Sequence, residues 1–255
     1  MNATALGKLF LVPTPLDFLC DTQVPLSQVL PLATVQTASQ IDHWVVENAK
    51  SARAFLKRVD AVSPLRVPLQ AQQINELPRL VHKKGDWVAG VDMRGMLQAA
   101  SQGHDIGLLS EAGMPAVADP GSSVVRAAHD LGMQVLPLVG PSALLLALAG
   151  SGLNGQQFAF GGYLPQDAAE RSLRLKALEQ HALKTGETQV FIETPYRNAA
   201  VLAALLHSLH DHTRLAVCSH VSLPEMRIQS MQVAQWKRHP QAPDKTTPAV
   251  FAFGP

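Results

Sequence analysis

The chain has 255 residues, of which 47% are hydrophobic and 16% charged, and its formal net charge is +1. This composition is typical of a folded domain and excludes a disordered chain, and the near-neutral charge excludes a global field that attracts nucleic acid. No apolar run approaches the roughly 20 residues of a membrane span, and the first residues lack the pattern of a signal peptide, so we expect a cytoplasmic protein without a membrane segment.

The first half of the chain alternates between short apolar runs and amphipathic stretches. The clearest amphipathic stretch, 49–59, places Ala52, Phe55, Leu56 and Val59 on one helical face. The predicted strands are 8–13, 43–46, 105–109 and 134–138, and the predicted helices are 26–33, 49–59, 75–81, 96–102 and 122–131. Strands that alternate with helices predict a mainly parallel sheet covered by helices.

A second α/β unit follows. Its predicted strands are 158–161, 189–192, 215–219 and 249–253, with a weaker one at 226–233, and its predicted helices are 142–149, 168–181 and 198–210. We therefore expect two α/β domains, an N-terminal domain over 1–138 and a C-terminal domain over 139–255.

Residues 108–149 carry the strongest indication of a ligand site. Two loops rich in glycine and proline follow two apolar runs, and in an open α/β sheet ligands lie beyond the carboxyl ends of the strands. Gly113, Gly121 and Gly140 stand where a positive φ or a close backbone approach is useful. The alternative interpretation is that these glycines mark ordinary turns.

Known catalytic signatures are missing from the sequence. It has no phosphate loop, dinucleotide fingerprint, zinc-protease motif or nucleophile elbow, and its two cysteines, Cys20 and Cys218, lie far apart. His207, His210 and His212 stand at the end of a polar helix, where the helix dipole accounts for them, so we predict no metal. Glycine- and proline-rich loops without a catalytic constellation favour a cofactor that carries an already activated group, as in methyl transfer from a sulfonium.

Six segments occur in an order that is similar to that of a known family. They are LFLVPTP (9–15), IGLLSEAGMPAVADPGSSVV (106–125), VLPLVGPSALLLAL (135–148), FAFGGYLP (158–165), VFIETPYR (190–197) and TPAVFAFG (247–254). On these segments the chain resembles the tetrapyrrole methylase superfamily of S-adenosylmethionine (SAM) methyltransferases. Within it, the branch that methylates the 2′-hydroxyl of cytidine ribose in 16S ribosomal RNA is the most similar.

The resemblance implies two α/β domains with a SAM-binding cleft between them, a homodimer and a ribosomal RNA substrate. The positions that it implies for SAM are Gly113, Met114, Pro115, Val117, Pro137, Leu138, Ser142, Glu193, Ala216, Val217, Cys218, Pro248 and Ala249. The positions that it implies for the substrate are Pro13, Thr14, Pro15, Asn75, Glu76, Tyr196 and Arg197.

The departures from the family pattern concern the substrate side. Asp17-Phe18 replaces a Gly-Asn pair, Glu47-Asn48-Ala49-Lys50 replaces an EDTR-like motif, and His220-Val221-Ser222-Leu223 replaces an ELTK-like segment. Glu47 and Lys50 are the candidate catalytic groups that accept the acceptor's proton. Two alternatives stay open: a methyltransferase for a tetrapyrrole or another small molecule, and a SAM-binding protein whose activity has decayed.

Overall fold

The computed structural model describes residues 5–18, 20–78, 80–81 and 91–255. Contacts divide the chain into unit 1, formed by Met1–Phe18 and Val24–Pro141, and unit 2, formed by Leu19–Gln23 and Ser142–Pro255. This division falls at 141/142, and the predicted domain boundary at 138/139 stays a proposal. The sequence gives no sign that the short segment 19–23 joins the second unit.

The described part of unit 1 contains a five-stranded parallel sheet in the order β3-β2-β4-β1-β5. Its strands are β1 (Leu9–Val12), β2 (His43–Val46), β3 (Gln73–Glu76), β4 (Ile106–Leu109) and β5 (Val135–Pro137). The inner strand β4 is buried at every position, as expected for a parallel sheet covered on both faces. The prediction of a mainly parallel sheet in this half is confirmed.

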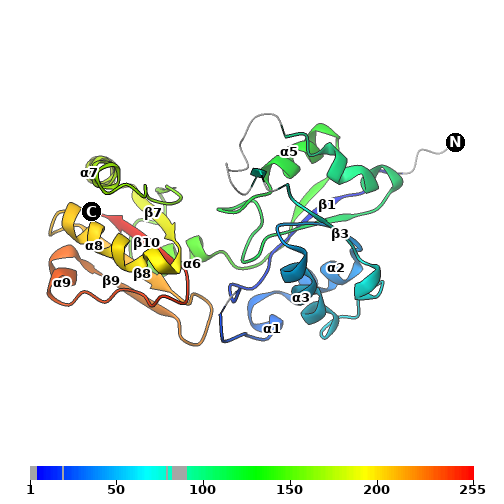
Figure 1. Cartoon of the computed structure of the whole chain (residues 1–255), viewed down its shortest axis with the longest axis horizontal. Coiled ribbons are helices and arrows are strands. Elements are labelled where there is room, and N and C mark those ends of the chain that lie inside the picture. Colours follow the sequence, from blue (N-terminus) through cyan, green and yellow to red (C-terminus); the bar gives the residue numbers. More distant parts are fainter. Residues whose placement is uncertain (1–4, 19, 79, 82–90) are drawn as a thin grey trace. The chain divides into compact units, whose positions relative to one another are not determined.

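Helices cover both faces of this sheet (Figure 1). They are α1 (Leu26–Val29), α2 (Leu32–Gln40), α3 (Ala49–Asp60) and α5 (Ser122–Asp130), with the 3-10 segments η1 (Leu69–Ala71) and η2 (Arg94–Gln102). One core joins α2 and α3 to Trp44 and Val46 of β2, and the other joins η2 and α5 to Val45 and Leu108. Adjacent residues of β2 therefore serve different cores, because side chains alternate across a strand.

Helix α3 forms for reasons that are readable in the sequence. The side chain of Asn48 caps it by accepting hydrogen bonds from the backbone N–H groups of Lys50 and Ser51. Its buried residues are Ala52, Phe55, Leu56 and Val59, which is the predicted apolar face. The helix ends at Asp60, one residue beyond the prediction.

Three predicted elements are wrong in part. The helix predicted over 75–81 overlaps β3, where Asn75 and Glu76 pair with β2; residue 79 lies outside the described residues. The helix predicted over 26–33 ends at Val29, and α2 begins after Pro31, which fixes an extended backbone at the junction. The strand predicted over 226–233 stops at Gln232, where a capping box starts α9.

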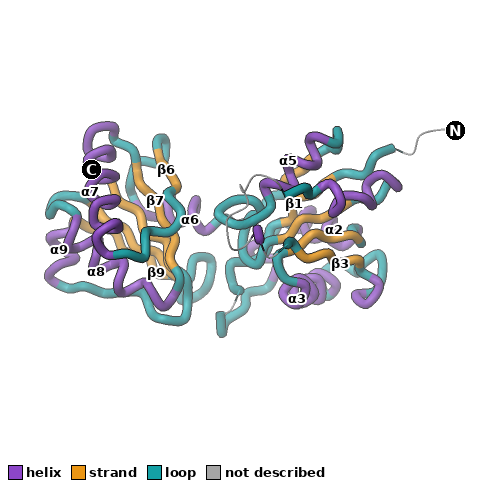
Figure 2. Tube along the Cα trace, turned by 45° about the horizontal axis from the view of Figure 1, so that its top comes forward, coloured by secondary structure: helices purple, strands orange, loops and turns teal. Residues whose placement is uncertain are grey.

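The described part of unit 2 contains a second five-stranded sheet in the order β6-β7-β10-β8-β9 (Figure 2). β6 runs parallel to β7, and the other pairs are antiparallel. The strands are β6 (Phe158–Phe160), β7 (Thr188–Glu193), β8 (Arg214–Ser219), β9 (Arg227–Gln232) and β10 (Ala249–Gly254). The other elements are α6 (Ala143–Ser151), α7 (Ala168–Thr185), η3 (Pro195–Arg197), α8 (Asn198–Ser208) and α9 (Val233–Arg238).

The main core of unit 2 lies between this sheet and α7, α8 and α9. It contains Phe191, Phe251 and Phe253 from the sheet and Trp236 from α9. Helix α6 packs against the same sheet, where the Cys218 Sγ–H donates to the Ala147 carbonyl at 3.9 Å. Among the described residues, no helix combines the length and apolar character that a membrane crossing requires.

A buried ion pair fixes the segment that follows β1. Arg58 of α3 donates to both carboxylate oxygens of Asp17, at 2.9 and 2.8 Å, and also to the carbonyl of Val24. The backbone N–H of Val24 donates to the same carboxylate. Asp17 therefore ties the loop after β1 to α3 through a bidentate pair.

We expect Arg58→Met to lower the free energy of unfolding by about 3 kcal/mol, because it leaves the carboxylate of Asp17 buried without its cation. Urea denaturation followed by circular dichroism measures the change. Arg53→Met is the matched control, because Arg53 is exposed on the same helix. Equal stability of the two variants would contradict the role assigned to the pair.

Candidate functional site

In unit 1, the loops that follow β1 and β4 are joined by a two-way backbone bridge. The N–H of Thr14 donates to the carbonyl of Gly113 at 3.0 Å, and the N–H of Gly113 donates to the carbonyl of Thr14 at 3.1 Å. The hydroxyl of Ser110 also donates to the Gly113 carbonyl, at 3.1 Å. The structure thus brings the predicted substrate-side segment Pro13–Pro15 next to the predicted cofactor loop.

Two of the glycines singled out in the sequence have specific structural reasons. Gly113 has a φ of +84°, a region that residues with a side chain rarely adopt. Gly140, in the loop after β5, lies so close to Pro13 that a Cβ atom would stand 2.2 Å from the Pro13 Cγ. The loops after β1, β4 and β5 therefore pack at one edge of the sheet, because the three strands are parallel neighbours.

The loop after β4 holds an unusual backbone. Ala116 and Ala118 have φ values of +64° and +65°, which cost free energy for a residue with a Cβ and are enriched at functional sites. Between them, Val117 is 45% exposed, and its N–H donates to the carbonyl of Met114. The predicted cofactor residues Gly113, Met114 and Val117 therefore share one tightly turned loop.

The second predicted loop lies at the end of β5. Pro137 is the last residue of that strand, and the N–H of the following Leu138 donates to the carbonyl of Leu11 in β1 at 2.9 Å. Ser142 is the N-cap residue of α6 and belongs to unit 2.

A cluster of carboxylates lies at the carboxyl ends of β2 and β4. Glu47 accepts a hydrogen bond from the backbone N–H of Glu111 at 3.2 Å, and the hydroxyl of Ser51 donates to the Glu111 carboxylate at 3.3 Å. Burial, together with the charges of Asp119 and Glu111, raises the pKa of Glu47 to about 8. Burial and the charge of Glu111 raise the pKa of Asp119 to about 7.

This cluster makes Glu47 the stronger of the two predicted catalytic groups. A carboxyl whose pKa lies near neutrality can both accept and release a proton under physiological conditions. Lys50 is exposed in the first turn of α3, where its backbone N–H donates to Asn48. Sequence reasoning missed Glu111 and Asp119, although both stand in the loop that the glycines had already marked.

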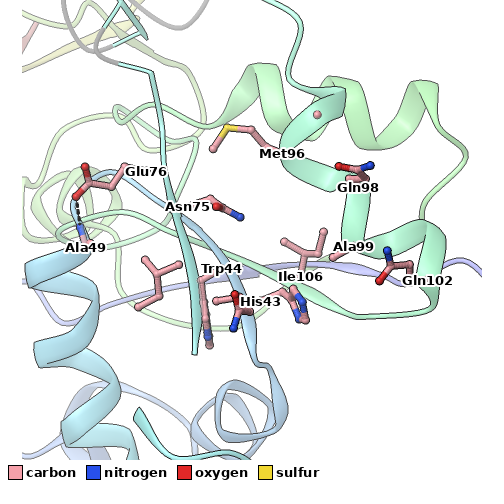
Figure 3. Close-up of a pocket in the computed structure, with 13 residues that line it drawn as sticks. His43, Trp44, Ala49, Asn75, Glu76, Met96, Gln98, Ala99, Gln102 and Ile106 are labelled. Carbon is pink, nitrogen blue, oxygen red and sulfur yellow. Dashed lines mark hydrogen bonds between the residues drawn. The ribbon is translucent and has the colours of Figure 1, made fainter. Parts of the chain in front are cut away.

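The other predicted substrate-side residues of unit 1, Asn75 and Glu76, line a cavity of about 940 Å³ between β3 and η2 (Figure 3). Glu76 accepts a hydrogen bond from the backbone N–H of Ala49 at 2.7 Å, at the start of α3. The lining is rich in side-chain amides, which come from Gln73, Asn75, Gln98 and Gln102. This cavity reaches from the carboxyl end of β3 along the strand to its first residue.

In unit 2, part of the predicted cofactor set gathers at one end of the sheet. β10 runs antiparallel between β7 and β8, so its first residue, Ala249, lies between Glu193 and Ser219. Cys218 is next to Ser219, and burial raises the pKa of its thiol to about 12, which makes it an inert packing group. Ala216 and Val217 are buried further along β8, where they pair with Ala252 and Phe251.

Glu193 is the most constrained of these residues. One carboxylate oxygen accepts hydrogen bonds from the backbone N–H and hydroxyl of Thr194, at 2.8 and 3.3 Å. The other oxygen is buried, lies 3.3 Å from the guanidinium of Arg197 and makes no hydrogen bond. Arg197 also donates to the carbonyls of Leu164 and Pro165, and the neighbouring Tyr196 is 85% exposed.

The segment that follows β8, 220–223, contributes to a small polar site in unit 2. His220 has a φ of +51°, and its imidazole lies 3.5 Å from the carboxylate of Asp244 and 3.4 Å from the hydroxyl of Thr247. His220 and Thr247 line a cavity of about 340 Å³ together with Cys20 and Thr22. Sequence reasoning did not anticipate this cavity, because its residues come from three distant segments.

The comparisons with known proteins agree on one family. The family model of the tetrapyrrole (corrin/porphyrin) methylases matches residues 33–236. The chain belongs to the tetrapyrrole methylase family. Within this family, it is similar to proteins named ribosomal RNA small subunit methyltransferase I. The relative from Pseudomonas aeruginosa is 30% identical over 229 residues, which are 90% of this chain and 71% of that protein.

Two further relatives carry the same name. The Bacillus subtilis protein is 30% identical over 81% of this chain, and the Mesorhizobium japonicum protein is 32% identical over 82%. The chain spans only 61% and 62% of the lengths of these two relatives.

Solved structures support the fold of this tetrapyrrole methylase. The methyltransferase CobJ matches with a TM-score of 0.58 and 16% identity, over 97% of this chain and 94% of that one. A Thermus thermophilus uroporphyrin-III C-methyltransferase complexed with S-adenyl homocysteine matches with a TM-score of 0.55 and 16% identity, over 97% of both chains. These similarities confirm the predicted α/β class with two sheets.

We expect the stability of the native chain to fall as the pH rises from about 4.5 to 8, in part because of Glu47. Its pKa in the folded state lies above the usual 4.5, so the folded state binds more protons than the unfolded state in this window. Glu47→Gln removes this contribution and flattens the decline of the melting temperature with pH. Differential scanning calorimetry at several pH values measures the effect.

Asp130→Asn is the matched control, because Asp130 is an exposed carboxyl at the end of α5 in the same unit. The control is expected to keep the decline seen in the native chain. If Glu47→Gln showed the native pH dependence as well, the assignment of a raised pKa to Glu47 would be wrong.

Proposed function

We propose that the protein is a SAM-dependent methyltransferase that acts on a ribose 2′-hydroxyl of ribosomal RNA. The observation that carries this proposal is the similarity, at 30 to 32% identity over most of this chain, to proteins named ribosomal RNA small subunit methyltransferase I. A cytoplasmic location and a homodimer form part of the same proposal. We propose no metal for this reaction.

Residues in both units suit a SAM molecule. In unit 1, the turned loop from Gly113 to Val117 offers backbone groups for close contact with a ligand. Pro137 ends β5, on the other side of β1 from β4, and Leu138 follows it. In unit 2, the buried carboxylate oxygen of Glu193 that makes no hydrogen bond is an acceptor suited to a hydroxyl or amino group. The other proposed positions are Met114, Pro115, Ser142, Ala216, Val217, Cys218, Pro248 and Ala249.

Methyl transfer from SAM to a hydroxyl requires few titratable side chains. SAM supplies, when bound, a methyl group that a sulfonium makes electrophilic. The protein then has to hold the acceptor hydroxyl in line and to take up its proton as the new oxygen–carbon bond forms. Glu47 is suited to this role. The pKa of its carboxyl group is about 8, so the ionised carboxylate is more basic than that of an ordinary glutamate and can receive the proton. Lys50 remains the second candidate.

A small-molecule acceptor such as a tetrapyrrole is the second candidate function. The net charge of +1 favours it, because binding of RNA usually relies on a concentration of basic residues. The two candidates differ in their salt dependence. Binding of RNA weakens steeply as the salt concentration rises, because the release of counterions from its phosphates then contributes less free energy. Binding of a small acceptor, which makes fewer ionic contacts, depends less on salt.

The decisive experiment offers labelled SAM and two acceptors to the purified full chain. One is small-subunit RNA from a strain that lacks its 2′-O-methyltransferases, and the other is uroporphyrinogen. We expect the label to appear on RNA as an alkali-resistant dinucleotide, which reports a 2′-O-methyl group. Label on the tetrapyrrole alone would establish the second candidate, and SAM binding in calorimetry without any transfer would leave a binding protein.

We expect Glu47→Gln to lower the rate of methyl transfer by about 10² or more, because the proton acceptor is lost, while the affinity for SAM stays unchanged. In the native chain the rate should rise with pH and level off above about 8, where Glu47 is ionised. Steady-state kinetics from roughly pH 6 to 9.5 measure the rate of the variant and the pH dependence of the native chain. Asp130→Asn is the control, and native turnover in Glu47→Gln would remove Glu47 from the mechanism.

A further inference from the structure

We propose that Asp42, His43 and His104 form a binding site for one Zn²⁺ ion at the amino ends of β2 and β4. Each of the three residues offers one ligand atom, and these atoms all lie within 4.8 Å of one another. Neither the family resemblance nor the methyl-transfer proposal uses these residues. The proposal does not rest on the proposed function.

The parallel pairing of β2 and β4 brings the two histidines together. His43 is the first residue of β2 and lies opposite Ile106 of β4, and His104 stands two residues before Ile106. The centroids of the two imidazole rings are 4.4 Å apart. Residues that are 61 positions apart in the sequence therefore meet because of strand register, and no short sequence motif indicates the pair.

The third residue is held in place by its neighbours. One carboxylate oxygen of Asp42 lies 2.8 Å from the His43 Nδ1, and the other accepts a hydrogen bond from Arg66 at 2.7 Å. The carbonyl of Asp42 accepts a hydrogen bond from the N–H of Gln73 at 2.8 Å. Arg66 holds one oxygen of the carboxylate, and the other, which lies beside the His43 imidazole, is the oxygen that we assign to the ion.

The backbone of His104 is fixed as well. Its N–H donates to the carbonyl of Ala99, and its carbonyl lies so close to Gly7 that a Cβ atom there would stand 1.9 Å away. Both histidines thus start from constrained backbones, and their side chains are partly exposed, so an ion from solvent can reach them. A site that is ordered before binding loses less entropy when the ion binds.

The donor set selects the class of ion. Imidazole nitrogen suits Zn²⁺ and its neighbours among the transition metals, whereas Mg²⁺ and Ca²⁺ prefer oxygen. Tetrahedral zinc with bonds of about 2.1 Å places its ligand atoms roughly 3.4 Å apart. The ion therefore has to draw in ligand atoms that stand up to 4.8 Å apart and to replace the 2.8 Å contact between Asp42 and the His43 Nδ1. We expect the two partly exposed imidazoles to rotate on binding, with water in the fourth position.

The position of the site defines its role. Glu47 and the proposed cofactor loops follow the carboxyl ends of the strands, whereas His43 begins β2 and His104 precedes β4. The ion therefore lies at the opposite end of β2 from Glu47, and it links the start of one inner strand to the loop that leads into the next. His43 also lines the cavity that contains Asn75 and Glu76, so the ion stands at the wall of that cavity. We assign the ion a stabilising role in unit 1.

The test titrates zinc chloride into the full chain, without a histidine tag and after dialysis against a chelator, in an isothermal calorimeter. We expect one Zn²⁺ per chain and a rise in melting temperature with zinc. His43→Ala and His104→Ala should each weaken zinc binding about tenfold or more and abolish the rise in melting temperature, and Asp42→Asn should weaken binding about tenfold. Magnesium chloride should produce neither effect.

The double variant His207→Ala/His212→Ala is the control, because it removes two of the three closely spaced histidines at 207–212, and it should bind zinc like the native chain. Native affinity in His104→Ala, loss of binding in the control, or no zinc binding by the native chain would overturn the site. Circular dichroism checks that each variant folds, and His43→Gln or His104→Gln replaces any alanine variant that does not. Failure of methyl transfer in the earlier experiment leaves this outcome unchanged.

Discussion

The parallel register of β2, β4, β1 and β5 is the constraint on which the rest of unit 1 depends. Because these strands run in one direction, every loop that follows them emerges at the same edge of the sheet. The reciprocal bridge between Thr14 and Gly113, and the contact between Gly140 and Pro13, then lock three loops together. The same register sets Glu47 beside the loop that carries Glu111.

The register has a second consequence at the opposite end of the strands. It aligns the start of β2 with the approach to β4, and so brings His43 beside His104. Two sites of different chemistry therefore arise from one strand pairing. The carboxylate cluster, with its raised pKa values, suits proton transfer, and the imidazole pair suits a transition metal.

Unit 2 gathers its residues by a different arrangement. β10 runs antiparallel between β7 and β8, so the carboxyl ends of those two strands flank the first residue of β10. Glu193, Ser219 and Ala249 meet there although they are distant in the sequence. The carboxylate of Glu193 is held by Thr194 and Arg197, and one of its oxygens keeps an unused capacity to accept a hydrogen bond.

The sequence by itself determined the elements that rest on local signals: the buried runs of β1 and β4, the apolar face of α3, and the glycine positions of the loops. It missed β3, because Gln73–Glu76 contains a single apolar residue and is held in place only by pairing with β2. It likewise did not reveal the carboxylate cluster around Glu47 or the meeting of His43 with His104. Tertiary structure decided these features. Long-range strand pairing and burial determine which side chains meet and how far their pKa values shift. Neither effect produces a periodic pattern in the sequence.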